Sequence, residues 1–381
     1  MAHHARGQDD TIIVNTCAVT TTAERQARQA IRRAHRERPD AKIVVTGCAS
    51  EIDAKRWMEL PGVVRVVPNA DKLKPTTWGD SKPGLPPSRH ARALLQVQQG
   101  CDHRCTFCII PYGRGDSRST PTTEAISRAR ALTEAGHREI VLTGVDIASW
   151  QGTDGEGLGL MCRTLLQDVP AIERLRLSSI DPVILDPETG DRDLWWLLEN
   201  EPRLMPHLHL SLQAGSDLIL KRMKRRHTTT QVASMLQHAR TLRPNIGVGA
   251  DLIAGFPTET DTLFNETLSF IEEQAIPFLH VFPYSERPGT PAARMPAVPN
   301  GERQARAAQL RAVGEANRDT FLEKFVGQTV NVLIETPDRG HSPEFAPVRF
   351  AADASPAVRG SIIPLSIYSD SEGHLLGRSP A

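Results

Sequence analysis

The sequence predicts an α/β protein with three regions: an N-terminal parallel βαβ domain, a central partial barrel of six strand–helix repeats, and a small C-terminal all-β barrel. Short apolar strands alternate with amphipathic helices over the first two regions, and a stretch rich in Pro and Gly separates them. After residue 325 the helical periodicity gives way to short β-rich runs. With 381 residues, the chain is long enough for two or three domains.

The first region predicts a strand at residues 11–15, a helix at 22–38 and a second strand at 42–46. A crossover of this length makes the two strands parallel and the connection right-handed. Cys17 and Cys48 each come just after one of these strands. Because the carboxyl ends of neighbouring parallel strands lie side by side, we expect both thiols at one edge of the sheet.

The central region alternates predicted strands and helices. The six candidate strands lie at residues 94–98, 139–143, 174–178, 207–212, 247–253 and 278–282. Helical patterns include residues 122–135, 229–242 and 261–274. Strands and helices in this order predict an α/β barrel, and such barrels place their chemistry at the carboxyl ends of the strands.

The C-terminal region carries β-rich runs at residues 328–335, 345–350 and 360–368. Barrels of this size commonly bind nucleic acid, but they also occur as passive appendages. The predicted domains are residues 1–75 (lacking a first strand and helix), a linker at 76–90, a central domain at 91–324 and the terminal barrel at 325–381.

Composition excludes little. Lys plus Arg and Asp plus Glu both number 45, so net charge does not point to nucleic acid. Arginines at positions 25 to 38 and a basic run at 221–227 each have two readings, a solvated face or an RNA contact. No apolar run is long enough to span a membrane and no signal-peptide core precedes residue 10, which predicts a cytoplasmic protein.

Three of the six cysteines, Cys101, Cys105 and Cys108, lie within eight residues. Such crowding in a long chain favours metal over disulfides. Three thiolates on a [4Fe–4S] cluster leave one iron open to activate a substrate. Zinc is the alternative, but it needs a fourth ligand, and His103 lies between two of the cysteines where it is poorly placed.

The C-x3-C-x2-C spacing, with Phe107 before the third cysteine, resembles the radical S-adenosylmethionine superfamily. Further segments resemble its methylthiotransferases: residues 14–17, 46–48, 108–119, 142–146, 177–182, 209–216 and 251–257. The C-terminal runs look like the RNA-binding TRAM domain of that family. Residues 111–118 and 208–227 look most like members that modify N6-threonylcarbamoyladenosine at position 37 of tRNA.

The resemblance implies that the cysteine triplet holds the radical-generating [4Fe–4S] cluster and that Cys17 and Cys48 match two ligands of a second, sulfur-supplying [4Fe–4S] cluster. One S-adenosylmethionine would methylate the sulfur. Another would be cleaved, and its radical would take the hydrogen from C2 of the adenine. The implied partners are the anticodon loop of tRNA, an electron donor such as flavodoxin or ferredoxin, and a sulfur source.

Further site candidates are polar or aromatic groups at predicted strand ends or in the following loops. The catalytic candidates are Asp146, Gln213 and Asp251. The cofactor-binding candidates are Phe107, Tyr112, Ser179 and Ser211. For each residue, ordinary loop or helix-capping chemistry is the alternative.

One departure from the family pattern concerns the second cluster. The family has a third cysteine ligand upstream of Cys17, whereas none of the sixteen residues before Cys17 is cysteine. The resemblance implies that Met1 is an internal methionine of a longer reading frame, or that this version has lost the site.

Two other functions remain open at this point. The same chemistry could act on isopentenyladenosine in tRNA or on an aspartate of a ribosomal protein. A different class is a non-catalytic RNA-binding protein with a structural metal site.

Overall fold

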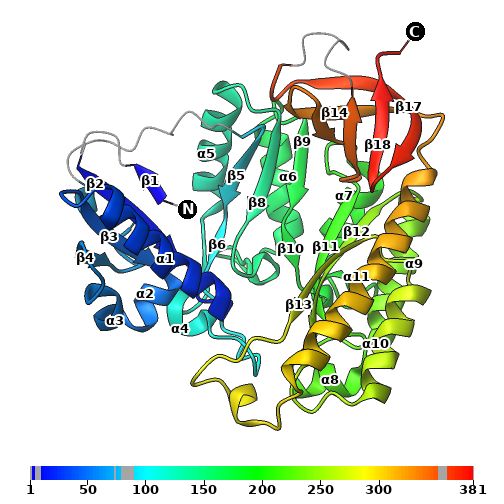
Figure 1. The fold of residues 1–381 in the computed structure, drawn as a ribbon. Coiled ribbons are helices and arrows are strands. Elements are labelled where there is room, and N and C mark those ends of the chain that lie inside the picture. Colours follow the sequence, from blue (N-terminus) through cyan, green and yellow to red (C-terminus); the bar gives the residue numbers. More distant parts are fainter. Residues whose placement is uncertain (1, 5–9, 73, 79–89, 351–357, 381) are drawn as a thin grey trace. The chain divides into compact units, whose positions relative to one another are not determined.

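The computed structural model describes residues 2–4, 10–72, 74–78, 90–350 and 358–380. The chain forms two compact units (Figure 1). The first contains Met1–Pro87, Gly100–Ser117 and Ser285–Met295, and the second contains Ser88–Gln99, Arg118–Tyr284 and Pro296–Ala381. Most of the predicted linker at 76–90 lies outside the described residues.

The first unit contains a four-stranded sheet of order β1-β2-β3-β4. Its strands are β1 (Ala2–His4), β2 (Thr11–Thr16), β3 (Lys42–Gly47) and β4 (Val63–Val67). β2, β3 and β4 are parallel, which confirms the predicted βαβ unit, and β1 pairs antiparallel with β2. Neither β1 nor β4 was predicted from the sequence.

Helix α1 (Thr21–Glu37) packs beside this sheet and buries Ile31 completely. Thr20 caps it by accepting the backbone N–H of Ala23 at 3.1 Å. The shorter helices of the unit are α2 (Cys48–Ile52), α3 (Ala54–Met58), α4 (Ile110–Arg114), η1 (Pro75–Thr77) and η4 (Pro291–Arg294). One apolar core joins α2 and α3 to the sheet and includes Trp57 and Ile109, which directly precedes α4.

The second unit contains two parallel sheets that follow one another along the chain. One has the order β5 (Arg92–Gln96), β8 (Glu139–Thr143), β9 (Arg174–Leu177). The other has the order β10 (Ser179–Ile180), β11 (His207–Gln213), β12 (Gly247–Ala254), β13 (Phe278–Pro283). Only Ser178 separates β9 from β10. This arrangement confirms the six predicted parallel strands and a barrel that does not close.

A two-residue strand, β6 (Gln98–Gln99), intervenes between β5 and the cysteine triplet. It pairs antiparallel with β7 (Arg118–Ser119). The structure thus places a second short strand between the first barrel strand and the triplet.

Helices cover the outside of the barrel strands. They are α5 (Thr122–Glu134), α6 (Leu158–Asp168), α7 (Arg192–Asn200), α8 (Asp217–Arg222), α9 (Thr229–Leu242), α10 (Asp261–Glu273) and α11 (Asn300–Glu323), with η2 (Ile147–Ser149) and η3 (Pro182–Leu185). Helix α11 runs beside β13 (Figure 1). No helix in the described residues is both long and apolar enough to span a membrane.

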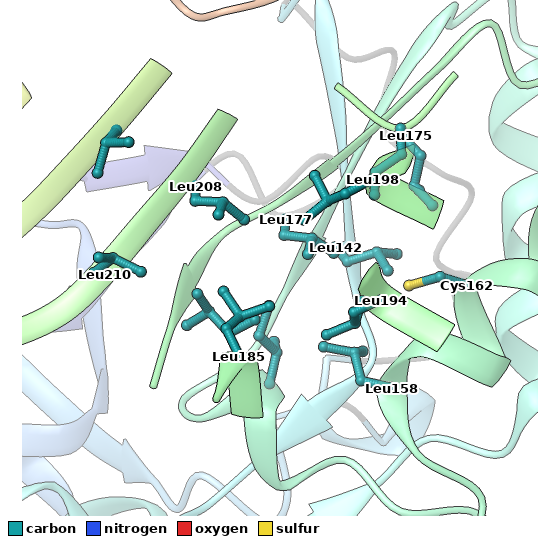
Figure 2. Close-up of a cluster of buried hydrophobic side chains, with 14 of the residues drawn as sticks. Leu142, Leu158, Cys162, Leu175, Leu177, Leu185, Leu194, Leu198, Leu208 and Leu210 are labelled. Carbon is teal, nitrogen blue, oxygen red and sulfur yellow. The ribbon is translucent and has the colours of Figure 1, made fainter. Parts of the chain in front are cut away.

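Leucines dominate the core between these helices and the strands. Figure 2 shows the sulfur of Cys162 among them, near Leu158 and Leu194. The Cys162 side chain is fully buried, which raises the pKa of its thiol far above the usual range. Cys162 is therefore a small core residue.

The C-terminal region forms a closed barrel of order β14-β15-β16-β18-β17. Its strands are β14 (Thr329–Thr336), β15 (Arg339–His341), β16 (Pro347–Phe350), β17 (Ile362–Ser371) and β18 (His374–Arg378). Phe321 and Leu322 from the end of α11 complete its core. The predicted all-β barrel is therefore confirmed.

Glu139, which is completely buried at the start of β8, ties this small barrel to the central strands. Burial alone would raise the pKa of Glu139, but Arg176 and Arg92 outweigh it and lower the pKa. Arg92 also binds Glu335 of β14 at 2.5 Å, and Arg176 donates to the carbonyl of Pro343 at 3.0 Å. The small barrel therefore contacts the amino ends of the strands, opposite to the ends where such barrels carry out chemistry.

Candidate active site

The three clustered cysteines lie on a loop that folds back on itself within the first unit. The backbone N–H of Cys101 donates to the carbonyl of Gly115 at 3.1 Å, and Ser117 N–H donates to Asp102 at 2.9 Å. Gly100 has φ +77°, and a Cβ there would come within 1.9 Å of the Asp116 carbonyl oxygen. Glycine is thus required for the loop to close.

All three thiols are partly exposed, and none forms a disulfide. A tetrahedral zinc site holds its sulfurs about 3.8 Å apart, given Zn–S bonds of about 2.3 Å. Among the described residues, these thiols do not belong to any group of three ligand atoms that all lie within 4.8 Å of one another. The donor set of three thiolates with wider spacing fits a [4Fe–4S] cluster between them better than a single ion.

Cys17 and Cys48 leave adjacent strands at the same level, because Thr16 of β2 is paired with Gly47 of β3. Gly47 has φ +108°, and a Cβ there would lie 2.3 Å from the Thr16 carbonyl oxygen. Cys17 is exposed, whereas Cys48 is buried at the first turn of α2. The structure therefore brings the two residues to one edge of the sheet, as the sequence predicts.

Helix α4, which directly follows the triplet, packs against Cys48. A Cβ on Gly113 would lie 3.0 Å from the carbonyl oxygen of Cys48, so a larger residue would push the helix away. Arg114 Nε donates a hydrogen bond to Cys48 Sγ at 2.8 Å. Asn69 donates to the carbonyl of Gly113 at 2.6 Å. Within the first unit, the loop that carries one set of thiols thus leads into a helix that contacts the other set.

Asp251 on β12 is the centre of a polar group in the second unit. Its Oδ1 lies 3.1 Å from His209 Nε2 and 3.3 Å from His280 Nδ1. Ser179 donates to Oδ2 at 3.2 Å. Burial alone would raise the pKa of Asp251, but hydrogen bonds from His209 and His280 outweigh it and hold the pKa well below its usual range. The Asp251 bond correspondingly raises the pKa of His280.

This group draws on four neighbouring strands, β10 to β13, and places two predicted residues, Ser179 and Asp251, in contact. Sequence reasoning missed both histidines. Asp251 is directly paired with His280 in the parallel register of β12 and β13. The signal was the spacing of polar residues within apolar strands, where buried leucines flank His209.

Ser211 and Gln213 lie farther along β11. Ser211 Oγ donates to the carbonyl of Ile180 at 3.3 Å and accepts from Arg225 at 3.0 Å. The register of β11 shifts between Leu210 and Gln213, and Gln213 has φ +75°. A non-glycine residue in this conformation is uncommon, so Gln213 marks a strained position at the end of β11.

Asp146 belongs to a separate local network after β8. Its backbone N–H and that of Val145 both donate to Gln98 Oε1, at 2.8 and 3.0 Å. Ser149 donates to the Asp146 carboxylate at 2.5 Å. Gln98 is buried and was not predicted, because an isolated glutamine at a strand end has no distinguishing pattern.

Of the remaining two candidates, Phe107 lies within the cysteine triplet and Tyr112 follows it, both in the first unit. Phe107 is partly buried beside Cys108, and Tyr112 is exposed on α4. The first unit thus carries the five predicted cysteines and both aromatic residues, and the second carries the predicted aspartates, serines and glutamine.

Residues 95–271 match the family described as the radical SAM superfamily, and residues 2–68 match the family described as uncharacterized protein family UPF0004. The radical S-adenosylmethionine methyltransferase TsrM from Kitasatospora setae has a similar fold, with a TM-score of 0.56 and 14% identity over 74% of this chain and 64% of that one. The open barrel, the cysteine spacing and the family match together define a radical SAM enzyme, which uses a [4Fe–4S] cluster and S-adenosylmethionine.

Three curated relatives narrow the class. The threonylcarbamoyladenosine tRNA methylthiotransferase MtaB of Rickettsia prowazekii is 42% identical over 97% of this chain and 90% of its own length. MtaB of Bacillus subtilis is 34% identical over 86% and 76%. A tRNA-2-methylthio-N(6)-dimethylallyladenosine synthase of Cereibacter sphaeroides is 34% identical over 87% and 80%. The chain belongs to the radical SAM methylthiotransferase family.

Proposed function

We propose that this enzyme replaces the hydrogen at C2 of N6-threonylcarbamoyladenosine, at position 37 of tRNA, with a methylthio group. The observation that carries the proposal is the 42% identity, over almost the whole chain, to a methylthiotransferase of that name. Dimethylallyladenosine is the competing substrate, because a relative at 34% identity acts on it by name.

Cys101, Cys105 and Cys108 would hold the radical cluster. When bound, this cluster supplies the electron that cleaves S-adenosylmethionine to a 5′-deoxyadenosyl radical. The loop's own contribution is geometric, because the bonds from Cys101 to Gly115 and from Ser117 to Asp102 fix the loop before the cofactor arrives. Phe107 and Tyr112 offer aromatic faces beside the thiols for the adenine of S-adenosylmethionine.

Cys17 and Cys48 would provide two ligands of a second cluster. Arg114 lies at this proposed site, since its Nε donates a hydrogen bond to Cys48 Sγ at 2.8 Å. Arg114 lies only six residues after Cys108, so one short segment serves both sets of thiols.

Within the barrel, Asp251, Asp146 and Gln213 would position the reacting groups, and Ser179 and Ser211 would bind the cofactor. Asp251 stays ionised because both histidines donate to it, so it can accept a hydrogen bond from an amine or a hydroxyl. Arg225 donates a hydrogen bond to Ser211 Oγ, and Ser149 donates one to the Asp146 carboxylate. The side chains are therefore fixed before the substrate binds.

We also propose that the chain divides into an N-terminal domain at residues 1–75, a linker at 76–90, a radical SAM domain at 91–324 and a terminal barrel at 325–381. The C-terminal barrel would serve as a TRAM-like RNA-binding domain that contacts the tRNA beside its anticodon loop. Reaction in the cytoplasm would also require an electron donor such as flavodoxin or ferredoxin, and a sulfur source.

The test uses enzyme purified without oxygen and reconstituted with iron and sulfide. It is incubated with S-adenosylmethionine, a reductant and tRNA that carries either threonylcarbamoyladenosine or dimethylallyladenosine, and the nucleosides are analysed by mass spectrometry. A methylthio product only from the first tRNA supports the proposal, and a product only from the second replaces it.

Iron content tests the ligand assignment. Two [4Fe–4S] clusters correspond to about eight iron atoms per chain. We expect the triple change of Cys101, Cys105 and Cys108 to Ala to remove about four of them. Cys162→Ala is the matched control, because this thiol is enclosed by the leucine core and should leave the iron content unchanged.

A further inference from the structure

Helix α1 presents a regular row of arginines to solvent. Arg25, Gln29, Arg32 and Arg36 recur at intervals of three or four residues, which places them on one face of the helix, opposite the buried Ile31. All four are exposed. At 1.5 Å per residue the row is about 16 Å long. We call Arg25, Arg32 and Arg36 the α1 arginine row.

The carboxylates of α1 do not neutralise this row. The helix contains five arginines and two glutamates. Glu24 is engaged by Arg28 and Arg287, and Glu37 by Arg33 at 2.8 Å. Within the described part of the chain, no ion pair or hydrogen bond involves the side chains of the α1 arginine row. These three guanidinium groups are therefore available to bind an anion.

An open groove of about 760 Å³ runs along the same helix. Its lining includes Gln26, Gln29, Arg32, Arg33 and Arg36, and none of the lining residues is acidic. Its apolar residues are small, Ala30 and Pro61. Protein partners are usually anchored by large aromatic or aliphatic side chains in a desolvated pocket, which this groove does not offer. A row of guanidinium groups interleaved with amides is instead suited to phosphates and ribose hydroxyls.

We infer that the α1 arginine row binds the phosphate backbone of the tRNA substrate, so that the first unit contributes RNA affinity in addition to sulfur chemistry. This inference rests on the proposed function for the identity of the RNA. Backbone contacts position a nucleic acid without reading its sequence, so the row acts on affinity rather than on the choice of nucleoside.

The test compares two triple variants of the reconstituted enzyme. R25Q/R32Q/R36Q removes the α1 arginine row. R128Q/R138Q/R163Q is the matched control, because it removes the same charge from partly exposed arginines that already pair with Glu124, Glu173 and Asp193. The dissociation constant for full-length tRNA is measured between 50 and 200 mM KCl, about the range over which phosphate contacts are strongly screened.

The expected result is a decrease of about two to three units in the slope of log affinity against log salt for the first variant, with affinity about 10- to 100-fold lower at low salt. The control and the iron content should stay at wild-type values. Equal slopes for both variants would overturn the inference. Unchanged tRNA binding with slower reduction by flavodoxin would also overturn it, in favour of an acidic protein partner. Binding needs no turnover, so an enzyme that binds tRNA through the row but modifies no nucleoside would sink only the proposed function.

Discussion

The two basic segments of this chain, α1 and residues 221–227, look alike in sequence, but some of their arginines have opposite environments. On α1, Arg25, Arg32 and Arg36 face solvent and have no bonded partner among the residues that the structure describes. In the segment 221–227, Arg225 is almost completely buried and lies 3.1 Å from Asp181, while Arg222 donates to the carbonyl of Thr258 at 3.0 Å. His227 is buried with its Nε2 3.2 Å from the Leu212 carbonyl oxygen.

The difference teaches that charge density in a sequence does not identify a binding surface. One of our readings of residues 221–227 was an RNA contact. The structure instead uses its central arginine to hold the strands, because Asp181 and the Ser211 carbonyl need donors where water cannot supply them. The α1 arginine row, which has no ionic partner among the described residues, is the one suited to binding a partner.

The largest expected effect distinguishes the two segments by stability. Arg225→Ala leaves the buried Asp181 without its main cationic partner and should lower the free energy of unfolding by about 3 kcal/mol. Arg32→Ala removes an exposed side chain and should change it by less than about 0.5 kcal/mol. Urea unfolding followed by circular dichroism measures both values. Similar losses of unfolding free energy for the two variants would mean that the burial of Arg225 beside Asp181 contributes nothing to stability.

The contribution of Asp181 to the stability of the fold should depend on pH. Burial would raise the pKa of Asp181, but His227, whose Nδ1 lies 3.8 Å from the carboxylate, and Arg225 outweigh it and hold the pKa well below the usual range. A carboxylate with a lowered pKa stabilises the fold above its unfolded pKa of about 3.9, and this contribution is lost as the pH falls toward the folded value.

The stability difference between wild type and Asp181→Asn should therefore be about 2 kcal/mol at neutral pH and should shrink below about pH 4. Thermal unfolding at several pH values measures it. Asp154→Asn removes an exposed carboxylate and controls for net charge. A difference that grows on acidification would contradict the assigned sign.

A smaller effect concerns the threonine caps at the amino ends of α1 and α9. Thr20 caps α1 with one hydrogen bond, whereas Thr228, which directly follows residues 221–227, forms a reciprocal capping box with Gln231 at the start of α9. Either Thr→Ala change should cost about 1 kcal/mol, and the loss at Thr228 should be the larger. Melting temperatures of both variants give the ranking, and Thr228→Ser should restore the wild-type value.

The smallest expected effect concerns Lys221 and Lys224, the two exposed lysines of residues 221–227. Lys221→Gln combined with Lys224→Gln should lower the salt slope of tRNA binding by less than about one unit. The measurement is the same titration that tests the α1 arginine row. If the salt slope decreased as much per removed charge as it does for the α1 arginine row, both segments would contact RNA.

Local patterns allowed most of the fold to be predicted. The six barrel strands appear within about two residues of the expected positions, because each is a compact apolar run. Helix α11 was missed because it packs through small residues such as Ala307 and Gly314, which leave no strong apolar stripe. Strands β6 and β7 are too short for any periodicity.

The site residues, like the fold, could be predicted only in part. The cysteine triplet could be found because its ligands are neighbours in sequence. The contacts of Asp251 with His209 and His280 depend on the parallel register of three strands separated by long crossovers. No local pattern encodes that register, since the intervening helices set it through packing.

The closed C-terminal barrel has a consequence for how partners can reach it. Each of its five strands is hydrogen-bonded to two neighbouring strands, so no strand of the ring has a wholly free edge in the part of the chain that the structure describes. A partner chain therefore cannot dock by adding a β-strand, and the same closure protects the domain against edge-to-edge aggregation. Recognition at this barrel must proceed through side chains and loops alone, which can be replaced without disturbing the hydrogen bonds that keep the ring intact.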